Sequence, residues 1–161
     1  MRSRKAIVIL GALVIIAVCV MVTALAWPAK EAGFVPPCHD ECAVVGMPSV
    51  NETLDYKVFY SDGMPYRFHV CMRVTTNDTG ALVYFTNPAE NDAWLKLRIT
   101  DTEGTVLGES GLVYPGEYIE SVVLHDLPSD GEAIILKVMG YERETYHSVG
   151  AVSIQTKIIN S

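Results

Sequence analysis

The sequence predicts an all-β domain, an antiparallel sandwich of two sheets with about 7–8 strands, preceded by one N-terminal transmembrane helix. Short runs of residues alternate between apolar and polar, which is the period of a strand with one buried face. Each run closes at Gly, Pro, Asn or Asp, and the runs recur at a spacing of roughly 8–12 residues. After Trp27 no stretch shows a convincing helical period.

The first element is an uncharged run of 22 residues, Ala6–Trp27, which follows three basic residues. As a helix it would be about 33 Å long, enough to cross a hydrocarbon core of about 30 Å. The basic flank is expected to stay in the cytoplasm, so residues 1–27 form a cell-membrane anchor and the rest lies outside. The alternative is a signal peptide that is cleaved after Ala26, which would make the domain a secreted one.

The chain after Trp27 is acidic, with nine basic and nineteen acidic side chains and a formal net charge of −10. Binding to a polyanion needs clustered Lys or Arg side chains, and the sequence shows no basic patch. We therefore expect no nucleic-acid partner.

Residues 28–50 are rich in Pro and Gly, and we interpret them as a linker to a domain at residues 51–161. The linker contains Cys38-His39-Asp40-Glu41-Cys42, whose side chains are competent metal ligands. A C-x3-C spacing without a second cluster is a poor zinc signature, so we expect no metal. A disulfide is the better interpretation outside the cytoplasm.

Cys71 is the expected disulfide partner of Cys38 or Cys42. Alternation along Tyr66–Val74 places its valines and Phe68 on one face and directs Cys71 outward, where a linker cysteine could reach it. The remaining thiol would be free or would join two chains. A bond between Cys38 and Cys42 would close only a very small loop.

The first three predicted strands are Leu54–Tyr60, Tyr66–Thr75 and Ala81–Thr86. The first two alternate and end at turn sequences, Ser-Asp-Gly and Asn-Asp-Thr-Gly. The third is more uniformly apolar, as expected for a strand covered on both faces, and Asn87-Pro88 ends it.

Trp94–Thr100 is the clearest strand, and we expect it to form a hairpin with Thr105–Leu107 around Gly104. Tyr118–Leu124, Ala133–Tyr141 and Val149–Ile159 complete the set. The expected core contains Phe68, Val70, Leu82, Leu95, Leu97, Ile99, Val122, Leu124, Leu136, Val138, Val152 and Ile154.

A series of turn residues between Val74 and Ile158 carries a resemblance. They are Asn87, Pro88, Asn91, Gly104, Ser110, Gly111, Pro115, Gly116 and Gly131. Their order resembles a group of small exported proteins of Gram-positive bacteria with one N-terminal membrane segment and one Ig-like β-sandwich. The resemblance implies an Ig-like architecture and a structural role for these residues, and it implies no catalytic residue. The paired core cysteines of true immunoglobulin domains are missing here.

No motif points to catalysis. Residues 108–111 (Gly-Glu-Ser-Gly) are one residue short of a nucleophile elbow and are predicted as a turn. The four histidines are scattered, and the acidic loops at 90–92 and 101–103 match no ordered calcium loop. We therefore expect no enzyme, no cofactor and no metal.

The sequence predicts a protein-interaction or structural accessory module of the cell envelope, held in the membrane through residues 6–27, with another envelope protein as partner. The anchor, the available strand edges and the missing catalytic cluster favour it. The alternative is a loop-based binding module for a carbohydrate, peptide or ion. A compact aromatic and acidic cluster of loop residues would favour this alternative, and Tyr114, Tyr118, Tyr141 and Tyr146 lie near strand ends. The oligomeric state is left open.

Overall fold

The computed structural model describes residues 35–60, 63–78 and 80–159. The compact unit of the domain begins at Pro36, inside the predicted linker. The predicted membrane segment, residues 6–27, lies outside the described residues. No helix within the described part of the chain is long and apolar enough to cross a membrane.

The described residues form ten strands and one short 3-10 turn, η1, so the all-β prediction is confirmed. The elements are β1 (Val44–Val45), η1 (Glu52–Leu54), β2 (Tyr56–Phe59), β3 (Phe68–Cys71), β4 (Arg73–Thr76), β5 (Gly80–Asn87), β6 (Ala93–Thr100), β7 (Val106–Val113), β8 (Glu117–Val123), β9 (Ala133–Glu142) and β10 (Ser148–Ile158).

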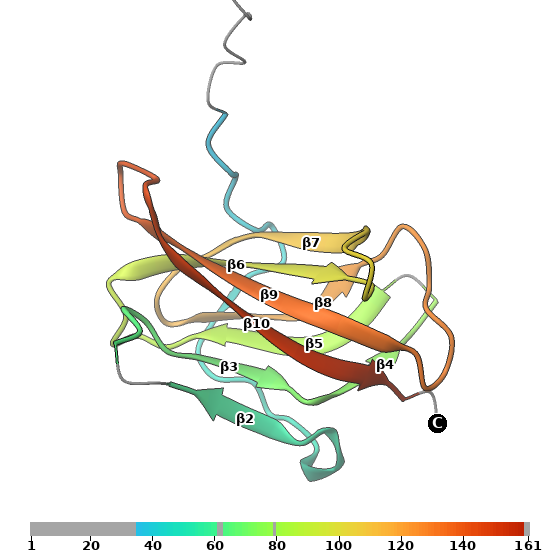
Figure 1. Ribbon diagram of the computed structural model, residues 1–161. Coiled ribbons are helices and arrows are strands. Elements are labelled where there is room, and N and C mark those ends of the chain that lie inside the picture. Colours follow the sequence, from blue (N-terminus) through green and yellow to red (C-terminus); the bar gives the residue numbers. More distant parts are fainter. Residues whose placement is uncertain (1–34, 61–62, 79, 160–161) are drawn as a thin grey trace, which may run out of the picture. The chain divides into compact units, whose positions relative to one another are not determined.

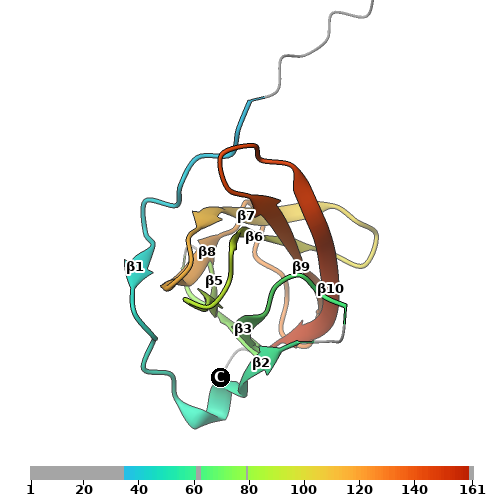
Figure 2. The same ribbon diagram turned by 90° about the vertical axis from the view of Figure 1, so that its left-hand side faces the viewer.

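The ten strands belong to one mixed sheet that curls into a half-barrel (Figures 1 and 2). We call β7, β6, β9 and β10, which pair in that order, the A half. We call β2, β3, β5, β8 and β1 the B half. Strand β4 joins the halves, because it pairs with β5 on one side and with β10 on the other.

The prediction of a purely antiparallel sheet is wrong at this junction. β10 pairs with β4 in parallel, with Lys157 opposite Arg73. The predicted strand Tyr66–Thr75 is two strands, because the chain bends at Met72; both strands pair with β5, but the second neighbour is β2 before the bend and β10 after it. The carbonyl of Met72 accepts a hydrogen bond from the hydroxyl of Thr156, so the bend is held by the last strand. A local period cannot reveal such a change of partner.

The interior is filled by the inward faces of both halves. Of the predicted core, all but three side chains are buried, and Val152 and Ile154 pack against it while partly exposed. Leu82 is the error: β5 directs Ala81, Val83 and Phe85 inward instead. The residues of Ala81–Thr86 all read as apolar or small, so composition could not settle which alternate set faces the core.

Candidate functional site

Four segments meet at one end of the domain, which we call the loop end. They are residues 63–67, 88–92, 114–116 and 143–147, and they are joined by hydrogen bonds and ring contacts. Strands of both halves lead into this end, so its geometry depends on how the halves are held together.

Asn87 ties the two halves together at the base of the loop end. Its side chain is fully buried, and its Nδ2 donates to the carbonyl oxygens of Ala93 at 2.9 Å and Val113 at 2.8 Å. Its Oδ1 accepts from Nδ2 of Asn91 at 2.7 Å. Asn87 closes β5 of the B half, whereas Ala93 and Val113 lie in β6 and β7 of the A half. A buried amide with all its partners fixes one arrangement of these strands.

Asn91 extends the network to two neighbouring segments. Its Oδ1 accepts from the backbone N–H of Arg67 at 3.0 Å, and its Nδ2 donates to the carbonyl of the same residue at 2.6 Å. Its carbonyl accepts from Nη2 of Arg143 at 3.0 Å, and that guanidinium lies 3.7 Å from the carboxylate of Asp92. The predicted Asn-Pro-x-x-Asn turn is therefore the brace of the loop end.

An open groove of about 410 Å³ lies beside this brace. It is lined by Pro65, Asp92, Ala93, Glu142, Arg143 and Val149. Three of these side chains are apolar, and the three charged ones are largely exposed to solvent. An apolar hollow with a few charged groups at its mouth is suited to hold an apolar side chain that has polar neighbours.

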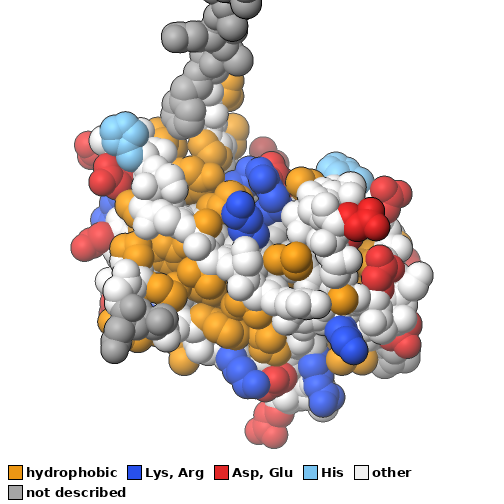
Figure 3. Space-filling view, in the orientation of Figure 1, with side chains coloured by type: hydrophobic (Ala, Val, Ile, Leu, Met, Phe, Trp, Pro, Cys, Tyr) orange, Lys and Arg blue, Asp and Glu red, His pale blue; other side chains and the backbone are white. Residues whose placement is uncertain are grey.

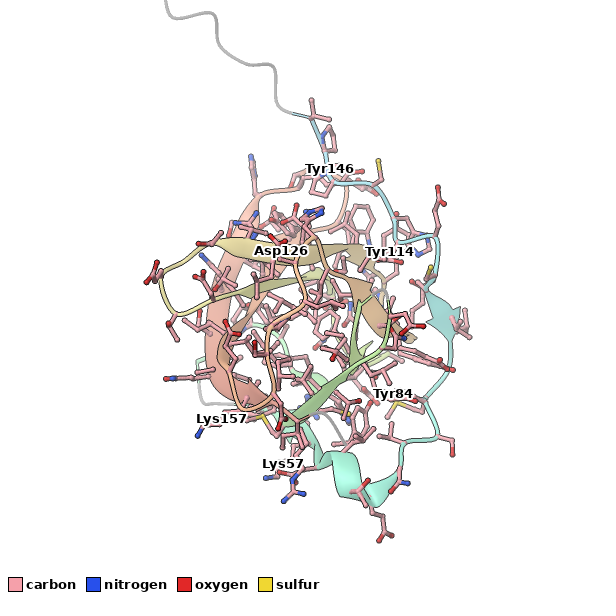
Figure 4. All side chains as sticks on the ribbon, turned by 90° about the vertical axis from the view of Figure 1, so that its right-hand side faces the viewer. Lys57, Tyr84, Tyr114, Asp126, Tyr146 and Lys157 are labelled. Atoms are coloured by element: carbon pink, nitrogen blue, oxygen red, sulfur yellow. The ribbon has the colours of Figure 1, made fainter. Side chains whose placement is uncertain are left out.

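An aromatic cluster lies at the same end of the domain and contains His39, Trp94, Tyr114 and Tyr146. The ring of Trp94 stacks on Tyr114 with centroids 4.7 Å apart and meets Tyr146 at 5.2 Å. The imidazole of His39 lies 4.3 Å from the ring of Tyr114. Figure 4 shows Tyr114 and Tyr146 at the same end of the domain, where the blue ribbon of the first described residues also passes. Four distant parts of the chain are thus joined by ring contacts.

Glu117 connects the cluster to the backbone. Its Oε2 lies 2.8 Å from Nε2 of His39 and accepts from the backbone N–H of Tyr114 at 2.9 Å. Burial raises the pKa of the Tyr114 hydroxyl, and Tyr146 and Glu117 raise it further. The hydroxyl therefore stays protonated and can donate a hydrogen bond at neutral pH.

The β9–β10 hairpin carries backbone strain at this end. Glu144 and Tyr146 have φ angles of 68° and 58°, in the left-handed region that most side chains avoid. Such conformations cost on the order of 1–3 kcal/mol each and persist where surrounding contacts impose them. The contact of Tyr146 with Trp94 is one of them. Strained loops of this kind cluster at binding sites.

The described part of the predicted linker is not separate from the domain. The backbone N–H of Leu112 donates to the carbonyl of Cys38 at 2.8 Å, and that of Asp40 donates to the carbonyl of Leu112 at 2.9 Å. Oδ2 of Asp40 also accepts from the N–H of Gly111 at 2.7 Å. A Cβ on Gly111 would lie 2.6 Å from the backbone of Asp40, so only glycine permits this approach.

Ser110 and Gly111 do not form the predicted turn, because both lie inside β7. The Oγ of Ser110 accepts from the N–H of Leu97 at 2.9 Å where the ladder between β6 and β7 shifts register. The other predicted turn, Pro115-Gly116, is present between β7 and β8. Gly116 has a φ of 85° and donates its N–H to the carbonyl of Asn87 at 2.8 Å.

The predicted pairing of Cys71 with Cys38 or Cys42 is not formed, since all three are free thiols. Cys38 and Cys42 are exposed, but Cys71 is 0% exposed, so the expectation that it lies open on the outer face is wrong. Tyr56 lies directly opposite Cys71 in the β2–β3 ladder. Burial, together with the nearby charge of Asp55, raises the pKa of the Cys71 thiol to about 12.

Within the described ranges, no three His, Cys, Asp or Glu side chains are grouped so that they could hold a metal ion. Comparison with protein-family models, curated proteins and solved structures found no match to this chain. The groups that the structure shows at the loop end are aromatic rings, an apolar hollow and a charged rim.

Proposed function

We propose that this chain is a membrane-anchored, extracytoplasmic interaction module of the cell envelope that binds a partner protein at its loop end. The observation that carries the proposal is the groove, with its apolar lining and charged mouth, at the same end of the domain as the aromatic cluster. Binding energy at protein interfaces concentrates where one apolar or aromatic side chain fills such a hollow. The uncharged run at residues 6–27 supports the anchor.

An Ig-like architecture is part of the proposal, and the order of the strands supports it. If β4 to β10 are lettered A, B, C, C′, E, F and G, the pairings are A-B-E in one half and G-F-C-C′ in the other. Variable-type immunoglobulin domains add C′ to the sheet of strands G, F and C. Their recognition loops B–C and F–G correspond to the turns at residues 88–92 and 143–147, whereas the turn at residues 114–116 joins C′ to E, because this lettering has no C″ strand. This support is an analogy of fold.

A carbohydrate is the second candidate ligand, and the aromatic cluster is what favours it. A sugar ring needs a free aromatic face on which to stack, however, and the ring of Trp94 already contacts both Tyr114 and Tyr146. We therefore favour a protein partner, and a peptide-like segment is the occupant that the groove suits best.

Site-specific photo-cross-linking in intact cells tests the proposal. A photoreactive amino acid replaces Glu142 at the groove, and in a matched variant it replaces Glu103 in the β6–β7 turn. We expect the photoreactive residue at position 142 to cross-link one recurrent envelope protein and the one at position 103 to give no such product. Equal products from both positions, or none from Glu142 where a known envelope complex cross-links, would contradict the proposal. Retention of the chain by cell-wall polysaccharide, lost on Trp94→Ala, would favour the carbohydrate instead.

A further inference from the structure

Basic side chains gather on the outer face of the A half and on β4 beside it. Along each strand these residues alternate with buried ones, so they project outward. Five of the eight described Lys and Arg side chains lie here, namely Arg73, Lys96, Arg98, Lys137 and Lys157. Among the described carboxylates, this face carries Glu109 alone. Four positive charges are therefore left uncompensated on a domain that is strongly acidic elsewhere.

Two cross-strand pairs on this face have like charges. Arg98 lies directly opposite Lys137 in the β6–β9 ladder, and Lys157 lies opposite Arg73 in the parallel β10–β4 pair. Like charges placed directly opposite each other destabilise a sheet. The fold alone gives no reason to keep two such pairs on one face.

Glu109 compensates only one corner of the face. Its Oε1 accepts from Nζ of Lys96 and its Oε2 from Nε of Arg98, both at 2.8 Å. Partial burial opposes ionisation of Glu109, but these two cations hold its pKa below the ordinary value. Among the described residues Lys137 has no ion pair. The corner shows how a carboxylate fits between cations on this face.

The spaces between the cations are apolar. Ile135, Met139 and Tyr141 are half-buried and alternate along β9 with the core residues Leu136 and Val138. Protein interfaces are enriched in Tyr, Met and Arg, whereas a chain of phosphates would gain nothing from an apolar neighbour. The composition of the face therefore fits the surface of another protein.

We infer that the outer face of the A half is a second docking surface, for a partner protein whose contacting surface is rich in Asp and Glu. In the view in which β9 and β10 face the reader, Figure 3 shows basic side chains in the upper middle and the lower part, with acidic side chains mostly toward the left and right edges and a few at the bottom. The acidic remainder of the domain does not cancel the attraction, because at physiological salt charges more than about 8 Å away are largely screened. Complementary charge of this kind speeds encounter and fixes orientation.

The test uses charge-reversal variants that also replace each like-charge cross-strand pair with a pair of opposite charges. Lys137→Glu places a carboxylate opposite Arg98, and Lys157→Glu places one opposite Arg73, so neither variant is expected to lose thermal stability. Lys57→Glu on β2 is the matched control, because it makes the same change in charge on the B half. Strand β2 pairs with β3 of the B half, whereas β10, which carries Lys157, pairs with β9 and β4. Each full chain is purified in detergent, and its binding to fluorescent poly-L-glutamate is measured together with its thermal midpoint.

We expect salt-sensitive binding that weakens on the order of tenfold in Lys137→Glu and in Lys157→Glu and is unchanged in Lys57→Glu. No binding to poly-L-glutamate, or equal weakening in all three variants, would overturn the inference. Tighter binding of inorganic polyphosphate than of poly-L-glutamate by tenfold or more would also overturn it, because the face would then be a phosphate site. The cross-link from the photoreactive residue at position 142 should persist when Lys137→Glu is added. Failure of this inference is therefore distinguishable from failure of the proposed function.

Discussion

The outer faces of the A and B halves follow the same strand period but have different surroundings. On the A half, outward residues such as Lys137 and Tyr141 are half-buried or more exposed, and they form an open face. On the B half, the outward residues Thr86 and Cys71 are both 0% exposed. The A face is therefore open along β9, whereas the B face is sealed around Cys71 and Thr86 but exposed at Val58 and Val123.

The seal on the B half is a polar and aromatic layer. The hydroxyls of Tyr56 and Thr86 are hydrogen-bonded, and the ring of Tyr56 lies 5.4 Å from that of His69. Residues 46–55 pass along this side of the domain (Figure 2). Within them, Met47 lines a hollow together with His69. Burial lowers the pKa of His69, so its imidazole stays neutral within this layer at neutral pH.

The difference teaches that alternation assigns residues to faces but does not tell which face is covered. Two arrangements keep the faces distinct: the Asn87 network that joins the halves, and the layer over the B half. The predictions below remove or probe each of them, from the largest expected effect to the smallest.

Asn87→Ala should have the largest effect on stability, because it removes the buried side chain that joins the A half to the B half. It leaves the carbonyls of Ala93 and Val113 without their donor in a buried setting, so we expect a loss of about 3 kcal/mol in the free energy of unfolding. Denaturant unfolding of the purified chain measures this loss. Asn51→Ala removes an exposed cap of η1 and should cost about 1 kcal/mol or less. Equal losses in the two variants would remove the bracing role of Asn87.

Thiol labelling measures the difference between the covered Cys71 and the exposed Cys38 and Cys42 as a difference in reaction rate. In the native chain at pH 8, Cys38 and Cys42 should react with iodoacetamide at least tenfold faster than Cys71, because the thiolate is the reactive form. Peptide mass spectrometry locates the label, and guanidinium should bring Cys71 to a similar rate. Rapid native labelling of Cys71 would show that the B half is not sealed.

The Cys71 thiol also predicts how stability depends on pH. Its pKa is raised from 9.0 to about 12 in the folded chain, so the folded state holds this proton more tightly than the unfolded state. The contribution of the protonated thiol to the free energy of unfolding is fully present below pH 9 and is lost as the pH rises toward 12. As the pH rises from 9 to 11, the free energy of unfolding should therefore fall less in Cys71→Ala than in the native chain. Denaturant titrations at each pH measure this fall. Parallel curves would contradict the burial of the thiol.

Tyr56→Phe tests the layer with a smaller change. It removes the hydrogen bond to the buried hydroxyl of Thr86 and should cost about 1 kcal/mol. Tyr60→Phe, at a side chain that is 58% exposed, is the control and should be neutral within about 0.5 kcal/mol. Chemical denaturation measures the change in the free energy of unfolding of both variants. No loss of stability in Tyr56→Phe would contradict a stabilising role of the layer.

Lys137→Glu should have the smallest effect on stability and the opposite sign. Replacing a like-charge pair with an ion pair opposite Arg98 should stabilise the sheet by about 0.5 kcal/mol at low salt. The gain should shrink as salt is added. A salt-independent loss of stability would mean that the two cations are not neighbours on one face.

The sequence predicted local structure well where a strict period was present. Trp94–Thr100 was expected as a strand with Leu95, Leu97 and Ile99 inside, and β6 confirms it. The bend at Met72 and the parallel β10–β4 pair were not predicted, because pairing is a non-local property that no period encodes. The same limit hid the cover over Cys71, since residues 46–55 have no period of their own.

The candidate site was predicted only in part. The turn residues Asn87 and Asn91 were singled out, and the structure shows that they brace the loop end. Their buried network and the contact between Trp94 and Tyr146, 52 residues apart in the sequence, depend on strand order. The basic face was missed for the same reason. Its cations are scattered along the chain between Arg73 and Lys157, and only the register brings them together.

The most direct test of recognition at the loop end combines the cross-link with a charge reversal. The photoreactive residue stays at position 142, and Asp92→Arg is compared with Glu103→Arg, an acidic-to-arginine change outside the groove. Both chains are expressed in intact cells, and the yield of the cross-linked partner is measured. We predict that Asp92→Arg lowers the yield several-fold, because Asp92 lines the groove, whereas Glu103→Arg leaves it unchanged. Equal yields from the two variants would contradict recognition at the groove.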